Sequence, residues 1–307
     1  MKVKYLRRNQ ESIEAQELVR HAFALARSLN ISTLLVQVNE FADVQAIEDV
    51  RGTETILWLI TNPDLSMQPK RKDGLIWIPE AELTRFSQLR VAIFRAVLDE
   101  KIALDESVVC LSGVAGSRRL DTVVIANARR DFPWFRERDL NVMKTVLVSR
   151  AFGRILEIAL RLASEGREGK AIGTTFVLGD LDELQPHLRQ LIINPCEGHS
   201  RKLRSIHNDN FFESIREFSA LDGAFLVSTK GVVESAGTYI DAPSTRIRLN
   251  PGLGARHAAA ASITSNTQSV AVVISESSGA VTVFHDGTSV LELEKPKPVP
   301  RRREKRE

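Results

Sequence analysis

Short apolar runs recur along this chain, and the segments that separate them change in character near its middle. Runs of this length, bounded by turn residues, are typical of buried strands. In the first half they are 33–38, 55–60, 75–78, 107–111 and 122–126, with helical patterns at 13–29, 44–50 and 83–98. Strands that alternate with helices favour a parallel sheet covered on both faces. The first half therefore predicts a parallel α/β sandwich.

The second half has a different pattern, because tight Gly and Ser turns separate its apolar runs. The expected strands are 174–180, 224–228, 232–233, 270–274 and 281–284, with hairpin turns at 229–231, 277–279 and 286–287. Hairpins join antiparallel neighbours, so a mixed central sheet flanked by helices is expected. A long helix over 139–164 and a helix over 211–220 are predicted to flank it, and 181–210 has the pattern of a loop.

The α/β chain of 307 residues, 43% of them hydrophobic, is long enough for two cores. We expect an α/β domain over 1–130, and a linker with the start of the bridging helix over 131–146. A second domain follows over 147–290, and a disordered basic tail over 291–307. The tail's Lys, Arg and Pro composition cannot bury apolar surface.

Charge and apolar content narrow the functional classes. The formal charge is +3, but residues 295–307 alone hold seven basic and two acidic residues, so the rest is slightly acidic. No basic face for nucleic acid is indicated. No run reaches the roughly 20 apolar residues that span a bilayer, and no signal peptide is evident. A cytoplasmic protein with reduced Cys110 and Cys196 is expected.

Asp222, Gly223 and Ala224 stand where a predicted helix leads into a predicted strand. Gly223 leaves room for a ligand, and the Asp222 carboxylate suits a hard cation such as Mg²⁺ or Mn²⁺. An ordinary turn accounts for this tripeptide as well, so it gains force only from its companions.

Gly254, Ala255, Arg256 and His257 open an alanine-rich helix. The N-terminus of a helix can face an anion, Arg256 can grip a phosphate, and His257 can donate a hydrogen bond to one. Capping or simple surface exposure would also explain this pair. The pattern is not a dinucleotide fingerprint, since histidine replaces its third glycine and no βαβ unit follows.

Ser275 and Glu276 end an apolar strand, where they can reach phosphate and metal respectively. A polar hairpin turn is the plain alternative. Tyr239 and Ile240 offer an aromatic and an aliphatic face to a purine, although Tyr239 could merely pack on the sheet.

Two further groups of residues are weaker candidates for a binding site. The loop 112–119 has glycines and serines before Arg118 and Arg119, which suits a small anion or an ordinary surface connection. His187, Cys196, His199 and His207 lie close in sequence, but without the regular ligand spacing of a structural zinc site.

The ordered set of Asp-Gly-Ala, Gly-Ala-Arg-His and Ser-Glu, with the segment from Gly166 to Gly179, resembles the diadenylate cyclase (DAC) domain over about 147–287. The strand and helix order of residues 1–130 resembles the C-terminal α/β domain of pyruvate kinases. The whole layout is similar to archaeal-type diadenylate cyclases. Two positions depart from the family pattern: Ala255 where threonine is usual, and Ala258 where a second arginine is usual. Arg246 or Arg248 could supply the missing cation.

The resemblance implies a nucleotidyltransferase that condenses two ATP into cyclic di-AMP and two pyrophosphates, with Mn²⁺ or Mg²⁺. It implies that Asp222, Arg256 and His257 are catalytic, and that Asp222 and Glu276 hold the metal. Gly223, Ala224, Tyr239, Ile240, Gly254, Ala255, Ser275 and Glu276 would bind nucleotide. The two-fold symmetric product implies a homo-oligomer of at least two chains. Two rivals remain: a nucleotide-binding or cyclic di-AMP-binding regulator that has lost catalysis, and a nucleic-acid scanning protein that uses the basic tail.

Overall fold

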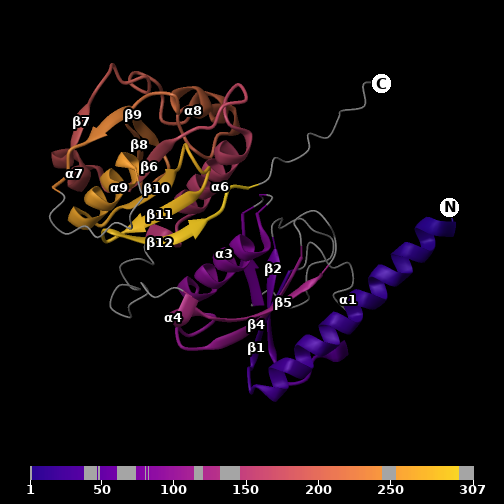
Figure 1. The fold of residues 1–307 in the computed structure, drawn as a ribbon. Coiled ribbons are helices and arrows are strands. Elements are labelled where there is room, and N and C mark those ends of the chain that lie inside the picture. Colours follow the sequence, from indigo (N-terminus) through magenta and orange to yellow (C-terminus); the bar gives the residue numbers. More distant parts are fainter. Residues whose placement is uncertain are drawn as a thin grey trace. The chain divides into compact units, whose positions relative to one another are not determined.

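The computed structural model divides the chain into two compact units, Met1–Arg136 and Glu137–Glu307 (Figure 1). It describes all residues except 1, 38–46, 48, 61–73, 80, 82, 114–119, 132–145, 244–253 and 297–307. The division falls within the segment 131–146 that was expected to link two domains. None of the helices in the described part combines the length and the apolar character needed to cross a membrane.

The first unit is built on one sheet whose strand order is β3-β2-β1-β4-β5. Its strands are β1 (Thr33–Gln37), β2 (Thr55–Ile60), β3 (Leu75–Trp77), β4 (Ser107–Ser112) and β5 (Thr122–Asn127). The first four are parallel, as predicted, but β5 runs antiparallel to β4. The connection from β4 to β5 is too short for the helical crossover that a parallel neighbour requires.

Helices in the first unit bury both faces of this sheet. Helix α1 (Lys2–Ser28) packs Phe23 and Ala26 against Leu34 and Val36 of β1. Helix α3 (Arg85–Leu98) begins at Thr84, whose side chain accepts from the backbone N–H of Ser87. Most residues of α3 are buried, and so is every residue of β1. A short helix, α4 (Ala128–Asp131), follows β5. Of the helix predicted over 44–50, the described residues 47, 49 and 50 are helical.

The second unit contains a mixed sheet of order β12-β11-β10-β6-β8-β9-β7. Its strands are β6 (Thr174–Gly179), β7 (Leu188–Gln190), β8 (Ala224–Ser228), β9 (Val233–Ile240), β10 (Val270–Ile274), β11 (Val281–His285) and β12 (Thr288–Leu293). Only the pairing of β6 with β8 is parallel, and the other neighbours are antiparallel. The predicted mixed sheet and its three hairpins are confirmed.

The second unit differs from expectation in three details. Strand β12 buries Leu291 and Leu293, so the folded unit extends past residue 290. Strand β7 lies inside the segment 181–210 that has the pattern of a loop, because three residues give no clear periodicity. The long helix predicted over 139–164 is interrupted: α6 (Arg150–Glu165) starts at Ser149, whose hydroxyl accepts from Phe152 N. Residues 139–145 lie outside the described part.

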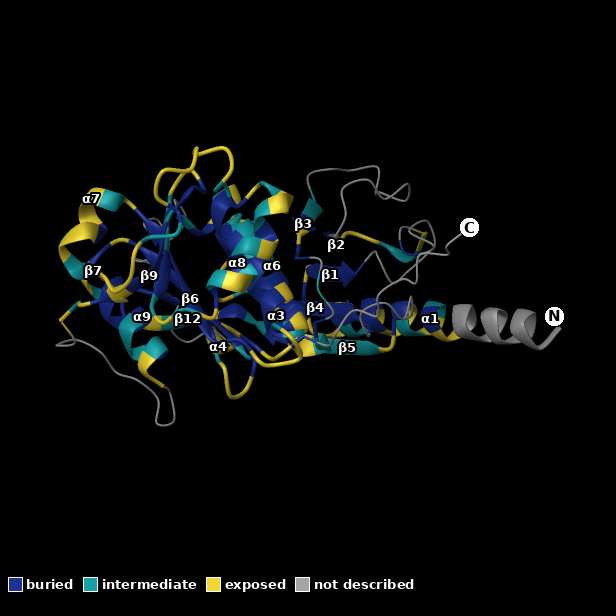
Figure 2. Ribbon diagram, turned by 90° about the horizontal axis from the view of Figure 1, so that it is seen from above, coloured by how far each residue is buried: buried dark blue, intermediate teal, exposed yellow. Residues whose placement is uncertain are grey.

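Helices α6 and α9 (Ala255–Asn266) cover opposite faces of the second sheet (Figure 1, Figure 2). Alanines Ala260 and Ala261 bring α9 close to the sheet, where they pack on Val273 and Phe284. Figure 2 shows β6 buried between the two layers. Shorter helices are α7 (Leu181–Leu184) and α8 (Phe212–Phe218), with single turns at Gln185–His187 and Asp209–Phe211. The close packing of α9 on the sheet places its first turn beside the ends of several strands.

Candidate active site

A cavity of about 1350 Å³ opens in the second unit, beside the first turn of α9. Residues predicted from widely separated segments line this one space: Asp222, Gly223, Ala224, Tyr239, Ile240, Gly254, Ala255, Arg256, His257, Ser275 and Glu276. Pockets for drug-sized ligands and cofactors usually enclose about 300–1,000 Å³, so a nucleoside triphosphate has ample room.

Asp222 and Gly223 occupy the turn between α8 and β8. The Asp222 side chain is 95% exposed, so a ligand can reach it at the cavity's edge. Gly223 has φ +106°, in the region that favours glycine. A Cβ at Gly223 would lie 2.7 Å from the backbone of Gly237 and Thr238. Glycine is therefore required here both by its dihedral angle and by the close passage of β9.

Arg256 makes ion pairs with the other two predicted motifs, those of Asp222 and Glu276. Its Nη1 donates to Glu276 Oε2 at 3.1 Å, and its Nη2 lies 4.0 Å from Asp222 Oδ1. Asp222 precedes β8 and Glu276 follows β10, and the two carboxylates lie at the same end of the sheet because β8 starts where β10 ends. Gly173 makes the contact possible, since a Cβ there would approach Glu276 Cβ to 2.6 Å and Arg256 Nη1 to 2.8 Å. One guanidinium thus lies between two acidic groups at the cavity wall.

The turn after β10 presents hydroxyl groups to the cavity. Ser275 N donates to Ala280 O at 2.9 Å and Gly279 N donates to Ser275 O at 2.8 Å, which closes the hairpin. Ser275, Ser277 and Ser278 line the cavity. Ser275 Oγ lies 3.3 Å from Ser277 Oγ, so the hydroxyls are already clustered. Such a group can hydrogen-bond phosphate oxygens.

His257 is the buried member of the set. It is 6% exposed, and its ring meets Phe284 edge-on with centroids 6.0 Å apart. Burial lowers the pKa of His257, the carboxylate of Glu292 works in the opposite direction, and the Arg256 guanidinium lowers the pKa further. In either protonation state the imidazole keeps an N–H that can donate a hydrogen bond.

Tyr239 and Ile240 contribute a further part of the cavity wall, on β9. Tyr239 is 44% exposed, whereas Ile240 is 9% exposed and packs in the core. The guanidinium of Arg189 sits 5.3 Å from the centroid of the Tyr239 ring, directly across from it in the pairing of β7 with β9. Arg189 also lines the cavity. No local pattern pointed to Arg189, because its strand is too short to stand out from a loop.

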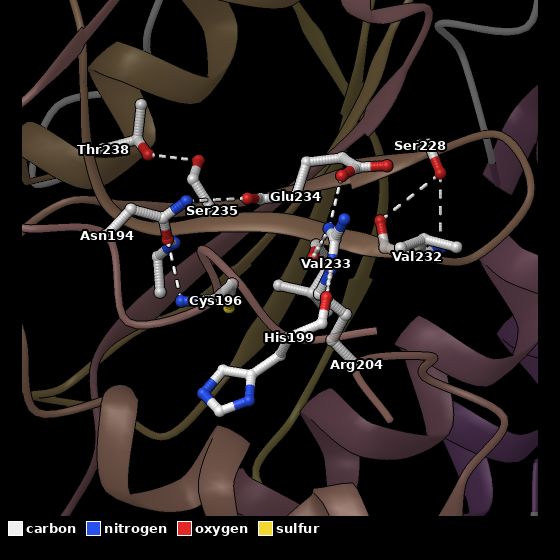
Figure 3. Close-up of polar contacts among 11 residues, drawn as sticks. Asn194, Cys196, His199, Arg204, Ser228, Val232, Val233, Glu234, Ser235 and Thr238 are labelled. Carbon is white, nitrogen blue, oxygen red and sulfur yellow. Dashed lines mark hydrogen bonds and ion pairs between the residues drawn. The ribbon is translucent and has the colours of Figure 1, made fainter. Parts of the chain in front are cut away.

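Hydrogen bonds tie the segment after β7 onto β9 (Figure 3). Asn194 Nδ2 donates to Glu234 O at 2.9 Å, and Arg204 forms an ion pair with the Glu234 carboxylate. Thr238 Oγ1, in the cavity wall, donates to Gln190 Oε1 at 3.0 Å. These contacts fix the position of β9 and hence of Tyr239.

The zinc alternative does not match this arrangement. Within the described residues, which include all four candidates, no group of three or more metal-ligating side chains comes together. His199 joins the network of Figure 3 through its carbonyl oxygen, which accepts from Arg204 Nε at 3.1 Å. Cys196 is buried, which raises the pKa of its thiol to about 11, and burial likewise raises the thiol pKa of Cys110 to about 12. Both cysteines are free.

Three polar residues on the sheet were not predicted to line the cavity. Thr175 of β6, Thr282 of β11 and Glu292 of β12 all do so. Two of these strands were predicted as core strands, β12 was not predicted as a strand, and only the register shows that the three positions share a face. Residues 114–119 of the candidate anion loop 112–119 lie outside the described residues, as do Arg246 and Arg248.

Comparison with known proteins gives one matching family model in each unit. Residues 161–289 match the family model described as DisA bacterial checkpoint controller nucleotide-binding (DAC). Residues 14–130 match the model described as probable sensor domain DacZ_P. The resemblance of the first unit to a pyruvate kinase domain stays a prediction.

Two curated relatives are each named diadenylate cyclase. The protein of Methanocaldococcus jannaschii is 37% identical over 57% of this chain and 56% of its own length. That of Haloferax volcanii is 36% identical over 46% of this chain and 51% of its own length. The chain thus matches about half the length of these relatives. A solved structure from Bacillus cereus, titled a hypothetical membrane spanning protein, covers 50% of this chain and 71% of its own at 20% identity and a TM-score of 0.37. With the family match and the two archaeal relatives together, the second unit of this chain is a member of the DAC domain family.

Proposed function

We propose that this chain is a diadenylate cyclase, which converts two ATP into cyclic di-AMP and two pyrophosphates. The observation that carries the proposal is the convergence of Asp222, Arg256 and Glu276 on one cavity within a DAC domain. Two relatives with that name share more than a third of the aligned residues. The hydroxyl-rich turn after β10 suits the phosphates of a nucleotide, and the ring of Tyr239 suits its base.

The donor set fits a hard divalent cation that nucleotide phosphates help to bind. Asp222 and Glu276 supply carboxylate oxygens, the ligands that Mg²⁺ and Mn²⁺ prefer. In the described part of the chain no third protein ligand joins them. Phosphate oxygens would complete the shell, so we expect cation and nucleotide to bind together. Bound there, the cation would lower the pKa of the attacking hydroxyl and neutralise charge on the phosphates.

The residues of this chain then have separate tasks. Asp222 would accept the proton of the ribose 3′-hydroxyl of one ATP. The 3′-oxygen of that ribose attacks the α-phosphorus of the second ATP. A new P–O bond forms, the bond between the α-phosphorus and the bridging oxygen breaks, and pyrophosphate leaves. Arg256 and His257 would donate hydrogen bonds to the α-phosphate oxygens as negative charge grows on them. The same exchange in the opposite direction closes the ring.

Ring closure requires two sites that face each other. Each nucleotide provides both a 3′-hydroxyl and an α-phosphate, and the product has two-fold symmetry. A pair of identical sites on two chains satisfies that symmetry with an isologous contact. We therefore propose that the active species is at least a dimer.

The test is to incubate the purified chain with ATP and either Mn²⁺ or Mg²⁺ and to identify the nucleotide products by mass. Cyclic di-AMP and pyrophosphate in a ratio of one to two are expected, and a chelator should abolish both. ATP binding without pyrophosphate release would instead indicate the regulator that Ala255 and Ala258 suggested. Isothermal titration calorimetry with a non-hydrolysable ATP analogue, on the same preparation, measures binding separately from turnover and so distinguishes the two outcomes.

A further inference from the structure

A row of side chains crosses one face of the second sheet and ends in a carboxylate. The strand registers pair Thr175 with Val273, Val273 with Thr282, and Thr282 with Glu292. Directly paired residues point to the same face of a sheet. Thr175, Thr282 and Glu292 all line the cavity, so this face is the one that α9 covers. Glu292 stands at the end of the row, on the edge strand β12.

His257 lies over the neighbouring row. Its ring contacts Phe284, which is two residues along β11 from Thr282 and therefore on the same face. Helix α9 also makes direct contacts with β12. Glu292 and His257 thus line the same cavity, one from a strand and the other from the helix that contacts this strand.

Among the described elements that pack against α9, few other titratable groups are found. Strands β6 and β10 carry none. On β11, His285 uses Nδ1 in a 3.0 Å hydrogen bond with Ser269 O. On β9, Glu234 is paired with Arg204, and Tyr239 lies against Arg189. The charged neighbours that act on His257 are Glu292 and the adjacent Arg256, with opposite effects.

We propose that Glu292 is a positioning residue for His257. The carboxylate of Glu292 supports the charged imidazole of His257 while the imidazole donates a hydrogen bond to a phosphate oxygen of the substrate. The inference rests on the proposed function for its catalytic consequence, but the coupling of the two side chains does not. Glu292 belongs to none of the three motifs that identified the site.

The physical argument starts from the burial of His257. A buried imidazole tends to lose its proton, and Arg256 next to it strengthens that tendency. Arg256 is itself in contact with Asp222 and Glu276, whereas Glu292, on the strand β12 that α9 contacts, is the carboxylate that acts on His257. A carboxylate in that place favours the charged imidazole and the orientation in which the ring faces the cavity.

The coupling is measured by NMR titration of the full-length chain labelled at histidine ¹³Cε1, without nucleotide. The His257 signal is assigned by its loss in His257→Gln. In Glu292→Gln the midpoint of the His257 titration should move to lower pH, and Glu292→Asp should restore part of that change. Glu294→Gln is the matched control, because Glu294 is an exposed carboxylate two residues further on that does not line the cavity. An unchanged midpoint in Glu292→Gln would overturn the inference.

The catalytic consequence is read from pH profiles of kcat and KM for ATP. A protonated His257 makes turnover fall as pH rises, and Glu292→Gln should shift that fall to lower pH. The loss near pH 8 should be about two- to fivefold, as expected of one partly exposed charge pair, with little change in KM. If the NMR midpoint moves but no variant forms cyclic di-AMP, the coupling stands and the proposed function fails. If cyclic di-AMP forms with identical profiles, the positioning role fails and the proposed function stands.

Discussion

Arg256 contacts two acidic side chains at the cavity wall. Its contacts with Glu276 and Asp222 balance like charges that would otherwise repel each other at the cavity wall. A cation that takes over the carboxylates would free the guanidinium for phosphate. Ala255 and Ala258 also line the cavity.

Replacing Asp222 by Asn should abolish turnover while the fold persists. The substitution removes a metal ligand and the proton acceptor, and we expect a loss of at least about a hundredfold in kcat. The side chain is exposed, so the midpoint of thermal unfolding should hardly change. Asp286→Asn in the turn before β12 is the control, since Asp286 does not line the cavity. An unchanged rate in Asp222→Asn would place the catalytic carboxylate elsewhere.

Two histidines should make stability depend on pH. Burial lowers the pKa of His257 below the ordinary value of 6.5, and partial desolvation together with Arg150 and Arg154 lowers the pKa of His207. The unfolded chain then binds more protons than the folded chain, so the free energy of unfolding falls as pH drops below that value. Urea denaturation at pH 7.5 and 5.5 should show this fall, and His257→Gln should reduce it. His199→Gln, at an exposed site, should not; an equal fall in wild type and His257→Gln would contradict the assignment.

At the scale of elements, the site depends on how closely β8, β9 and α9 approach each other. Small residues set these distances. Gly223 allows the turn before β8 to pack closely against β9, and the alanines of α9 allow the helix to pack closely on the sheet. Gly254 stands at the N-cap of α9 and has no side chain that could accept from the N–H groups of the first turn. The cavity is thus a product of close backbone packing.

Gly223→Ala should therefore destabilise the second unit. An alanine cannot easily adopt φ +106°, and its Cβ would meet backbone atoms at 2.7 Å. We expect a loss of more than about 1 kcal/mol in the free energy of unfolding. Gly254→Ala is the matched control: a Cβ added at Gly254 would have no atom within 4 Å, and the φ of Gly254 is −81°. Equal stability of the two variants, measured by urea denaturation, would show that the turn tolerates a side chain.

At the scale of the whole molecule, the chain joins a unit that matches a probable sensor domain to a DAC domain. The proposed reaction needs two such cavities that face each other, and two copies of the chain would supply them. Assembly and activity should accordingly be linked.

The specific activity should fall as the protein is diluted. Turnover per chain is measured over a range of protein concentrations, and sedimentation gives the oligomeric state at each. We expect activity to follow the fraction of assembled chains, because a lone site cannot supply both the attacking hydroxyl and the second α-phosphate. A monomer with full activity per chain would refute the two-site proposal.

Local patterns in the sequence determined much of this protein. Apolar runs and tight turns predicted most strands, since burial and turn chemistry act over a few residues. Motifs around Asp222, Arg256 and Ser275 predicted the walls of the cavity for the same reason. The sequence did not predict the short strand β7, which carries Arg189. It also did not predict that α6 begins after its N-cap Ser149, because the helical pattern continues through this position.

The tertiary structure alone decided which strand neighbours which, and thus what meets in space. The antiparallel course of β5 follows from a short connection, and the contact of Arg256 with two distant carboxylates follows from sheet order. Glu292 faces the cavity because β12 pairs with β11 in one register, and a shift by one residue would turn it to the other face. Register is fixed by the packing of the whole sheet, which is why no local pattern could reveal it.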